Sequence, residues 1–260
     1  MFILSEKNEQ ILPSFFMNSV PKSGTHLLKS VLQGMPNVTH NPEYEFYGGH
    51  TSKLKDDFYR LAQINPNQFG AGHVYYSPEW SFMLQRLGMK HVFIYRDPRD
   101  IIISFAYFIA EKYPQHPLHE YFSHEVLTQK ERYLTLIRGI DNERICYPNI
   151  AAWFRPFQGW IEDPYTFTLT FEELLESAAT RRLTLARLVN YLWEKQRMNI
   201  PFSVMIRQME ERMDPKYSLT YRSGKIGNWK KEFDEEVKEA FKEVAGDLLI
   251  QLGYEESDNW

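Results

Sequence analysis

Residues 14–32 read SFFMNSVPKSGTHLLKSVL, and no other stretch of the chain carries so clear a structural signal. The apolar, aromatic run up to Val20 is typical of a buried strand, which Pro21 ends. After PKSGT, apolar residues recur at helical spacing until Gly34 and Pro36. The pattern predicts a strand, a short loop and a helix in direct succession.

The PKSGT loop has the chemistry of an anion site. A loop that leaves a strand and opens a helix directs free backbone N–H groups and the positive helix end toward one point. Lys22 adds a positive charge, and Gly24 permits a close backbone approach. The hydroxyls of Ser23 and Thr25 add donors. The lysine precedes the glycine, so the loop is not the Walker A pattern, but we still expect it to bind phosphate.

Two further stretches predict strands of the same kind. HVFIY at residues 91–95 is followed by Asp97 as a cap, Pro98 and an apolar helical stripe. YTFTLTF at residues 165–171 precedes another helical stretch, which continues through Leu192. Strands separated by helices pair in parallel, and ligands bind beyond their carboxyl ends. The sequence therefore predicts an α/β fold, a P-loop-like three-layer sandwich with a central parallel β-sheet flanked by helices.

One domain is expected over residues 1–260, because this length fits a single large α/β domain. Residues 37–69 and 111–148 are polar, rich in aromatic residues and weakly periodic. Loops on a rigid α/β scaffold usually carry specificity, so we expect these stretches to be insertions that form an acceptor site and its lid. Beyond Phe233, apolar residues at helical spacing predict a long amphipathic helix.

Composition limits the class of partner and the compartment. Thirty basic against 34 acidic residues give a net charge of −4, which argues against nucleic acid binding. A lone cysteine, Cys146, favours a reducing compartment, and we expect a cytoplasmic protein. The first residues do not resemble an export signal, and no apolar run is long enough to cross a bilayer, so no membrane association is expected.

In the order of its motifs, the chain resembles the sulfotransferases of the cytosolic type, which use 3′-phosphoadenosine 5′-phosphosulfate (PAPS). PKSGT after a strand is similar to the family's 5′-phosphosulfate loop. The resemblance implies that the donor's 5′ end is bound by Lys22, Ser23, Gly24, Thr25 and His26. YRDPRDIIISFAYF, residues 95–108, is similar to the family's 3′-phosphate segment and implies Arg96 and Ser104 as ligands.

Two more segments match the family in order. YRSGKIGNWKKEF, residues 221–233, resembles the C-terminal R-K-G-x-x-G-x-W-K-x-x-F segment. It implies that Arg222, Ser223 and Gly224 close over the 3′-phosphate. GHVYYSP places His73 where the family has its catalytic histidine.

The chain also departs from the family pattern. His26 and Leu27 stand where the family commonly has a threonine and an adenine-stacking tryptophan, so Phe202 is the candidate to contact the purine. Ala71 replaces a lysine that often precedes the catalytic histidine by two residues. Ser223 replaces a second lysine, so each change removes a positive charge.

The resemblance implies in-line transfer of a sulfuryl group from PAPS to a hydroxyl or amine of a small-molecule or sugar acceptor, leaving adenosine 3′,5′-bisphosphate (PAP). His73 is the expected general base, because imidazole titrates near neutrality, and Lys22 is expected to stabilise the leaving phosphate. No metal site is expected, and a homodimer is possible. The alternatives are a P-loop nucleotide-dependent kinase and a catalytically inactive nucleotide-binding module.

Overall fold

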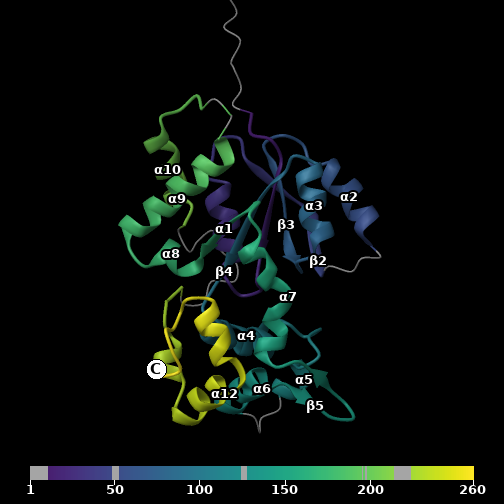
Figure 1. Cartoon of the computed structure of the whole chain (residues 1–260), viewed down its shortest axis with the longest axis vertical. Helices are drawn as coiled ribbons and strands as arrows, with labels where there is room; N and C mark the ends of the chain where they lie inside the picture. Colours follow the sequence, from purple (N-terminus) through teal and green to yellow (C-terminus); the bar gives the residue numbers. More distant parts are fainter. Residues whose placement is uncertain (1–10, 49–52, 124–127, 195, 197, 214–223) are drawn as a thin grey trace, which may run out of the picture.

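The computed structural model describes residues 11–48, 53–123, 128–194, 196, 198–213 and 224–260. Within these residues, the main sheet has the strand order β2-β3-β1-β4-β7, and all neighbouring strands are parallel (Figure 1). This arrangement confirms the predicted α/β fold. The strands of this sheet are β1 (Phe15–Ser19), β2 (Thr39–Gly48), β3 (Gln68–Val74), β4 (Lys90–Tyr95) and β7 (Thr166–Thr170).

Alternate residues of β1 face two different layers of helices. Phe15 and Met17 belong to the core on one side of the sheet, and Phe16 belongs to the core on the other. The first core is covered by α1 (Thr25–Leu32), α8 (Phe171–Leu175), α9 (Ala178–Trp193) and α10 (Phe202–Glu211). The second side carries α2 (Leu54–Ala62), α3 (Pro78–Arg86) and α7 (Ile150–Glu162). Burial of this central strand on both faces explains why Phe15, Phe16 and Met17 form a continuous apolar run.

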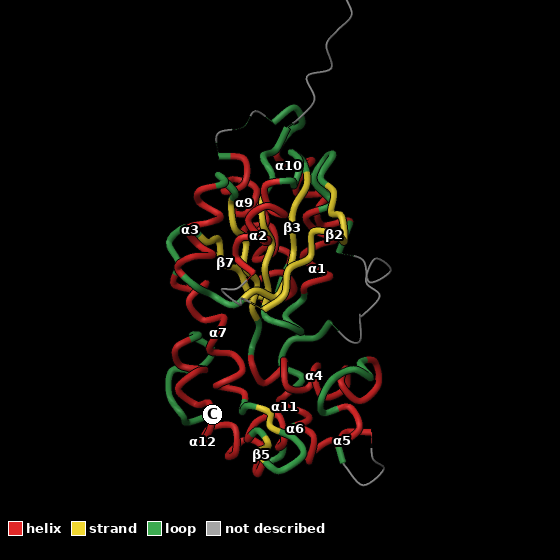
Figure 2. The backbone as a smooth tube through the Cα atoms, turned by 90° about the vertical axis from the view of Figure 1, so that its right-hand side faces the viewer, coloured by secondary structure: helices red, strands yellow, loops and turns green. Residues whose placement is uncertain are grey.

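A separate group of helices lies beyond the carboxyl ends of the strands, in the lower half of Figures 1 and 2. It includes the long C-terminal helix that the sequence predicts. Of the described helices, none is both long and apolar enough to cross a bilayer. The group consists of α4 (Pro98–Lys112), α5 (His119–Ser123), α6 (Gln129–Arg138), α11 (Trp229–Glu232), α12 (Glu235–Gln251) and the hairpin of β5 (Ile140–Asp141) and β6 (Cys146–Tyr147).

The two weakly periodic stretches contain more regular structure than their sequence indicates. Residues 37–69 supply β2, an edge strand of the main sheet, together with α2. The register of β2 against β3 shifts between His40 and Glu45, and this irregularity hides the alternation of a strand. Residues 111–148 supply two helices and the β5–β6 hairpin. The helical stretch after β7 is also two helices, α8 and α9, with Ser177 capping the second.

Candidate active site

The loop between β1 and α1 leaves the start of the helix open to a ligand. Gly24 is the N-cap of α1 and adopts a left-handed conformation with φ of 93°. No side chain caps this helix, so its first N–H groups keep their donor capacity. A Cβ at Gly24 would lie 2.7 Å from Cδ2 of Phe171, which only glycine avoids. The backbone thus forms a cradle for an anion at the helix start, as the sequence predicts for PKSGT.

Lys22 also has a positive φ, 68°, and its side chain lies over an aromatic ring. Its Nζ is 3.6 Å from the ring centroid of Phe108. Burial, and then the nearby positive charge of Arg96, lower the pKa of Lys22 to about 8. Lys22 is therefore a partly desolvated cation, which gains more from a bound anion than a solvated lysine does.

A second cationic group lies at the end of β4. Arg96 is only 7% exposed. Its Nη2 donates hydrogen bonds to the Asp100 carboxylate (3.1 Å) and to the Lys225 carbonyl oxygen (2.9 Å). Its Cζ lies 4.2 Å from the ring centroid of Phe171. Its buried Nε has no hydrogen-bond partner. Because Arg96 also lines the cavity, its planar guanidinium is suited to bind phosphate oxygens.

Asp100 joins α4 to the C-terminal segment. Its carboxylate accepts from the backbone N–H of Gly227 (2.8 Å) and of Trp229 (3.1 Å), as well as from Arg96. These bonds bring a segment about 130 residues further along the chain onto the start of α4, and Gly224 lies on the wall of the same cavity as Arg96. The predicted convergence of these two segments is thus present in the described residues.

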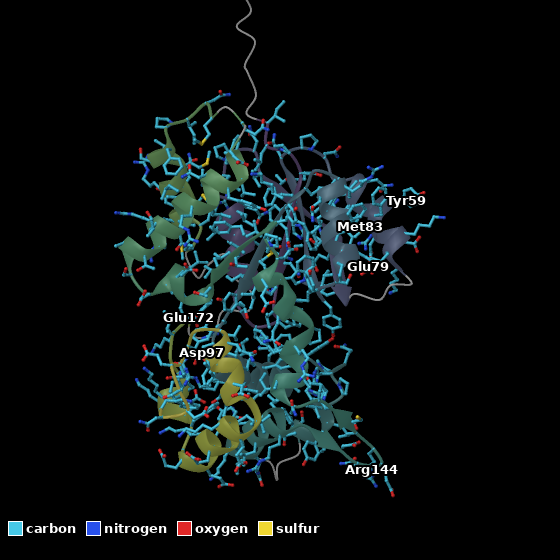
Figure 3. All side chains as sticks on the ribbon, in the orientation of Figure 1. Tyr59, Glu79, Met83, Asp97, Arg144 and Glu172 are labelled. Carbon is cyan, nitrogen blue, oxygen red and sulfur yellow. The ribbon has the colours of Figure 1, made fainter. Side chains whose placement is uncertain are left out.

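Arg99 anchors the same junction. Its guanidinium bonds to Asp97 and to Glu255, and it lies 3.7 Å from the ring centroid of Trp229. The backbone N–H of Asp97 in turn donates to Glu172 (3.2 Å), and Figure 3 labels this pair where the sheet meets the lower helices. Through Trp229 and Glu255, the C-terminal part of the chain therefore holds the start of α4, next to Arg96, in place.

His73 lies near the carboxyl end of β3 and is held by the neighbouring strand. Its Nδ1 is 2.8 Å from the Ser19 carbonyl oxygen, which can only accept, so Nδ1 carries the hydrogen. Nε2 therefore keeps its lone pair in the neutral ring. Asn18 fixes this edge by bonding to both the N–H and the C=O of Val74. Burial lowers the pKa of His73 to about 4, so the imidazole is neutral at pH 7.

A polar network that the sequence does not reveal adjoins His73. Glu45 accepts hydrogen bonds from Lys29 and from the Tyr47 hydroxyl, and the Tyr47 ring lies 5.9 Å from that of His73. Although burial opposes this shift, the bonds from Lys29, Tyr47 and His40 lower the pKa of Glu45 to about 2. The Glu45 carboxylate is thus ionised at pH 7, and it already accepts hydrogen bonds from Lys29 and Tyr47.

One cavity of about 1100 Å³ is lined by Lys22, Gly24, Tyr47, His73, Arg96 and Asp100. Aromatic side chains from several elements form much of its wall, which is the usual lining for a flat organic ligand. The aromatic lining residues are His26, Tyr47, His73, Tyr75, Phe105, Phe108, Tyr113, His116, Tyr147, Trp153, Phe157 and Phe171.

Most of the predicted site residues lie on this cavity. Its wall includes Lys22, Gly24, Thr25, His26, His73, Arg96, Ser104 and Gly224. The Ser23 side chain is fully buried, and its hydroxyl has no partner. Phe202 packs against the core beside α1 and is not part of the cavity wall, whereas Leu27 is. Arg222 and Ser223 lie outside the described residues.

A search for metal sites gives a negative result within the part of the chain that the structure describes. No group of three or more His, Cys, Asp or Glu side chains is placed to hold an ion.

A family comparison agrees with the fold and with this set of side chains. The model of the sulfotransferase domain family matches residues 12–253, so the chain belongs to the sulfotransferases. The resemblance stated from the sequence motifs is thus confirmed. No curated protein sequence matches the chain closely.

Solved structures share the fold at low sequence identity. A mouse sulfotransferase, SULT7A1, complexed with PAP, is 18% identical, with a TM-score of 0.63 and coverage of 91% of this chain and 84% of that one. Retinol dehydratase with androsterone and the inactive cofactor PAP is 17% identical, with a TM-score of 0.56 and coverage of 91% and 80%. Retinol dehydratase with retinol and PAP is 16% identical, with a TM-score of 0.58 and coverage of 91% and 81%.

Proposed function

We propose that this sulfotransferase moves the sulfuryl group of PAPS to a hydroxyl or amine of a small-molecule or sugar acceptor. The observation that carries the proposal is the pair of cationic groups, Lys22 with the open start of α1 and the largely buried guanidinium of Arg96, on the wall of one cavity with His73. PAPS carries two separated anionic groups, and this cavity offers two sets of donors for them.

The residues fit the donor at both of its ends. The Gly24 cradle, Thr25, His26 and Lys22 would hold the 5′-phosphosulfate, where backbone N–H groups approach closely. Arg96, Ser104 and Gly224 would hold the 3′-phosphate, together with Arg222 and Ser223 from the sequence motif. The related structures named above contain PAP, which supports the same donor here.

The adenine contact remains a prediction. Phe202 was expected to contact the purine, but it lies in the core beside α1 rather than on the cavity wall. Phe171, which stacks on Arg96, lies beside Gly24 and lines the cavity, adjoins both proposed phosphate sites. We therefore assign it to the nucleotide rather than to the acceptor.

Two side chains would do the chemistry. Bound PAPS supplies an activated sulfuryl group, and the protein supplies position, charge and a proton acceptor. His73 Nε2, with its lone pair free, would take the proton from the acceptor hydroxyl or amine. Lys22 would stabilise the negative charge on the leaving phosphate. No metal ion enters this mechanism.

The acceptor would occupy the aromatic part of the cavity. Retinol and androsterone appear with one structural neighbour, and the ring-lined wall of this chain likewise favours a small apolar alcohol. Tyr47 comes from residues 37–69, and Tyr113, His116 and Tyr147 come from residues 111–148. Both stretches would thus serve the acceptor site, as expected. A cytoplasmic location and a homodimer stay predictions.

Transfer of labelled sulfuryl from PAPS to a panel of alcohols, phenols, amines and sugars tests the proposal, with ATP and magnesium as the competing donor. We expect turnover with PAPS in the presence of a chelator. The His73→Gln variant should lose about 10²–10⁴ in turnover while it still binds PAP. Transfer from ATP alone would favour the kinase, and PAP binding without any turnover would favour the inactive module.

A further inference from the structure

A second histidine, His116, lies on the cavity wall, and its hydrogen-bonding state is opposite to that of His73. Its Nδ1 accepts a hydrogen bond from the backbone N–H of Leu118 at 3.1 Å. An imidazole nitrogen that accepts from an N–H carries no hydrogen, so in the neutral ring the hydrogen is on Nε2. Burial, and then His119, lower the pKa of His116 to about 4, which keeps the ring neutral at pH 7.

The Nε2–H group of His116 is available to a ligand. No described residue accepts a hydrogen bond from it, and the nitrogen is not sealed within the protein, although the residue is only partly exposed. The neighbouring hydroxyl of Tyr147 is different, because it is also without a partner but is buried. His116 therefore presents an accessible neutral N–H donor on the cavity wall, close to the exposed Tyr113.

Aromatic rings surround His116 on the cavity wall. Its ring centroid lies 5.3 Å from those of Phe105 and Tyr147, and 5.5 Å from that of Tyr113. Further ring contacts lead from Phe105 to Trp153, at 5.4 Å. A ligand group bound here leaves water and meets one N–H donor among apolar faces, which suits an uncharged oxygen better than a carboxylate.

We infer that His116 selects acceptors that carry a hydrogen-bond-accepting oxygen, such as a ketone, at a second position on an otherwise apolar ring skeleton. The reacting hydroxyl of such a molecule meets His73 on β3, while its second oxygen meets Nε2–H of His116 in the segment between α4 and α5. The two histidines have different roles, because His73 Nε2 accepts a proton and His116 Nε2–H donates a hydrogen bond. This assignment rests on the proposed sulfuryl transfer.

The test compares matched acceptors that differ only in the second oxygen. One pair is cyclohexanol and 4-hydroxycyclohexanone, and the other is androsterone and its analogue without the ketone. In each, the hydroxyl and the ketone lie at opposite ends of the skeleton. With PAPS as donor, we expect kcat/KM to favour the ketone by about tenfold in at least one pair, the effect of one well-placed hydrogen bond.

Two variants distinguish the effect of the His116 Nε2–H donor from the effect of the His116 ring contacts. His116→Phe keeps the ring contacts and loses the hydrogen, whereas His116→Asn keeps an oxygen for the Leu118 N–H but does not reach the Nε2 position. Both should reduce the preference to within about twofold, because KM rises more for the ketone than for the acceptor that lacks it. Melting temperatures of both variants, with and without PAP, check that the site is intact.

Each result decides the inference. A ketone preference that survives in both variants, or no preference in the parent protein, overturns it. A parent protein that binds PAP but turns over neither pair refutes this acceptor class and leaves the donor site standing. A parent protein that does not bind PAP refutes the proposed function itself.

Discussion

The charge of Lys22 can be followed through the pH dependence of sulfuryl transfer. In the free protein its pKa is about 8, lowered first by burial and then by Arg96. About nine-tenths of the side chain is therefore protonated at pH 7 and about one-tenth at pH 9. If the ammonium holds the 5′ end of PAPS and stabilises the leaving phosphate, kcat/KM should fall about tenfold for each pH unit above 8.

The acid side of the profile reports on His73. Because its pKa is about 4, the base is unprotonated from pH 5 upward, and kcat/KM should be flat between about pH 5 and pH 7.5. An unperturbed histidine would instead give a limb near pH 6.5. An alcohol rather than a phenol should be the acceptor, so that its own ionisation does not enter the measured range.

The Lys22→Arg variant is the matched control. A guanidinium stays charged throughout this range, so the alkaline limb should disappear even if the overall rate is lower. Bound PAPS should raise the pKa of Lys22 in the parent protein, which places the limb in kcat at higher pH than the limb in kcat/KM. A parent profile that is flat to pH 10, or an alkaline limb that persists in Lys22→Arg, would refute the assigned role of Lys22.

Three further predictions concern binding and stability. Arg96→Ala should weaken PAP binding by roughly 1.5–3 kcal/mol by calorimetry, with partial rescue by lysine; unchanged affinity would mean that the 3′-phosphate site is misplaced. Gly24→Ala should lose PAP binding because its Cβ meets Phe171. Gly88→Ala, at φ of 66° with nothing within 4 Å, should cost only about 1–2 kcal/mol of stability, and equal PAP affinities in the two variants would contradict this. Burial lowers the pKa of His91 to about 3, so as pH falls below about 6.5 the unfolded state takes up a proton that the folded state does not. The parent protein should therefore lose about 2 kcal/mol more stability between pH 7 and pH 5 than His91→Phe, measured by urea unfolding. An equal loss in the two proteins would refute the assignment.

Local sequence patterns were sufficient for the parts of the fold in which one short stretch carries the whole signal. β1, the PKSGT loop and α1 follow one another within 18 residues, and their apolar spacing and glycine are decisive by themselves. The same holds for β4 and α4, where Asp97 caps the helix as predicted. His73 was found through the GHVYYSP segment, which resembles that of the family, and not through a predicted strand.

Features that depend on distant residues could not be found in this way. Glu45 resembles a solvated charge in the sequence, and only the pairing of β2 with β3 brings Tyr47, its partner, beside His73. Asp100 is one of several acidic residues until the C-terminal segment folds onto it. His116 looks like a loop histidine, because the Leu118 bond and the three rings around it are visible only in the folded chain.

The central claim is that one cavity holds both phosphates of PAP, and calorimetric titration of the parent protein with PAP, ADP and magnesium ATP tests it most directly. PAP and ADP both carry two phosphates on adenosine, but ADP has both at the 5′ position and only PAP has a 3′-phosphate, which would meet Arg96. We predict that PAP binds at least about tenfold more tightly than ADP, since one charge-assisted hydrogen bond is worth that much, and that Arg96→Ala narrows the difference. Equal affinities for PAP and ADP, or magnesium ATP bound far more tightly than PAP, would contradict the account.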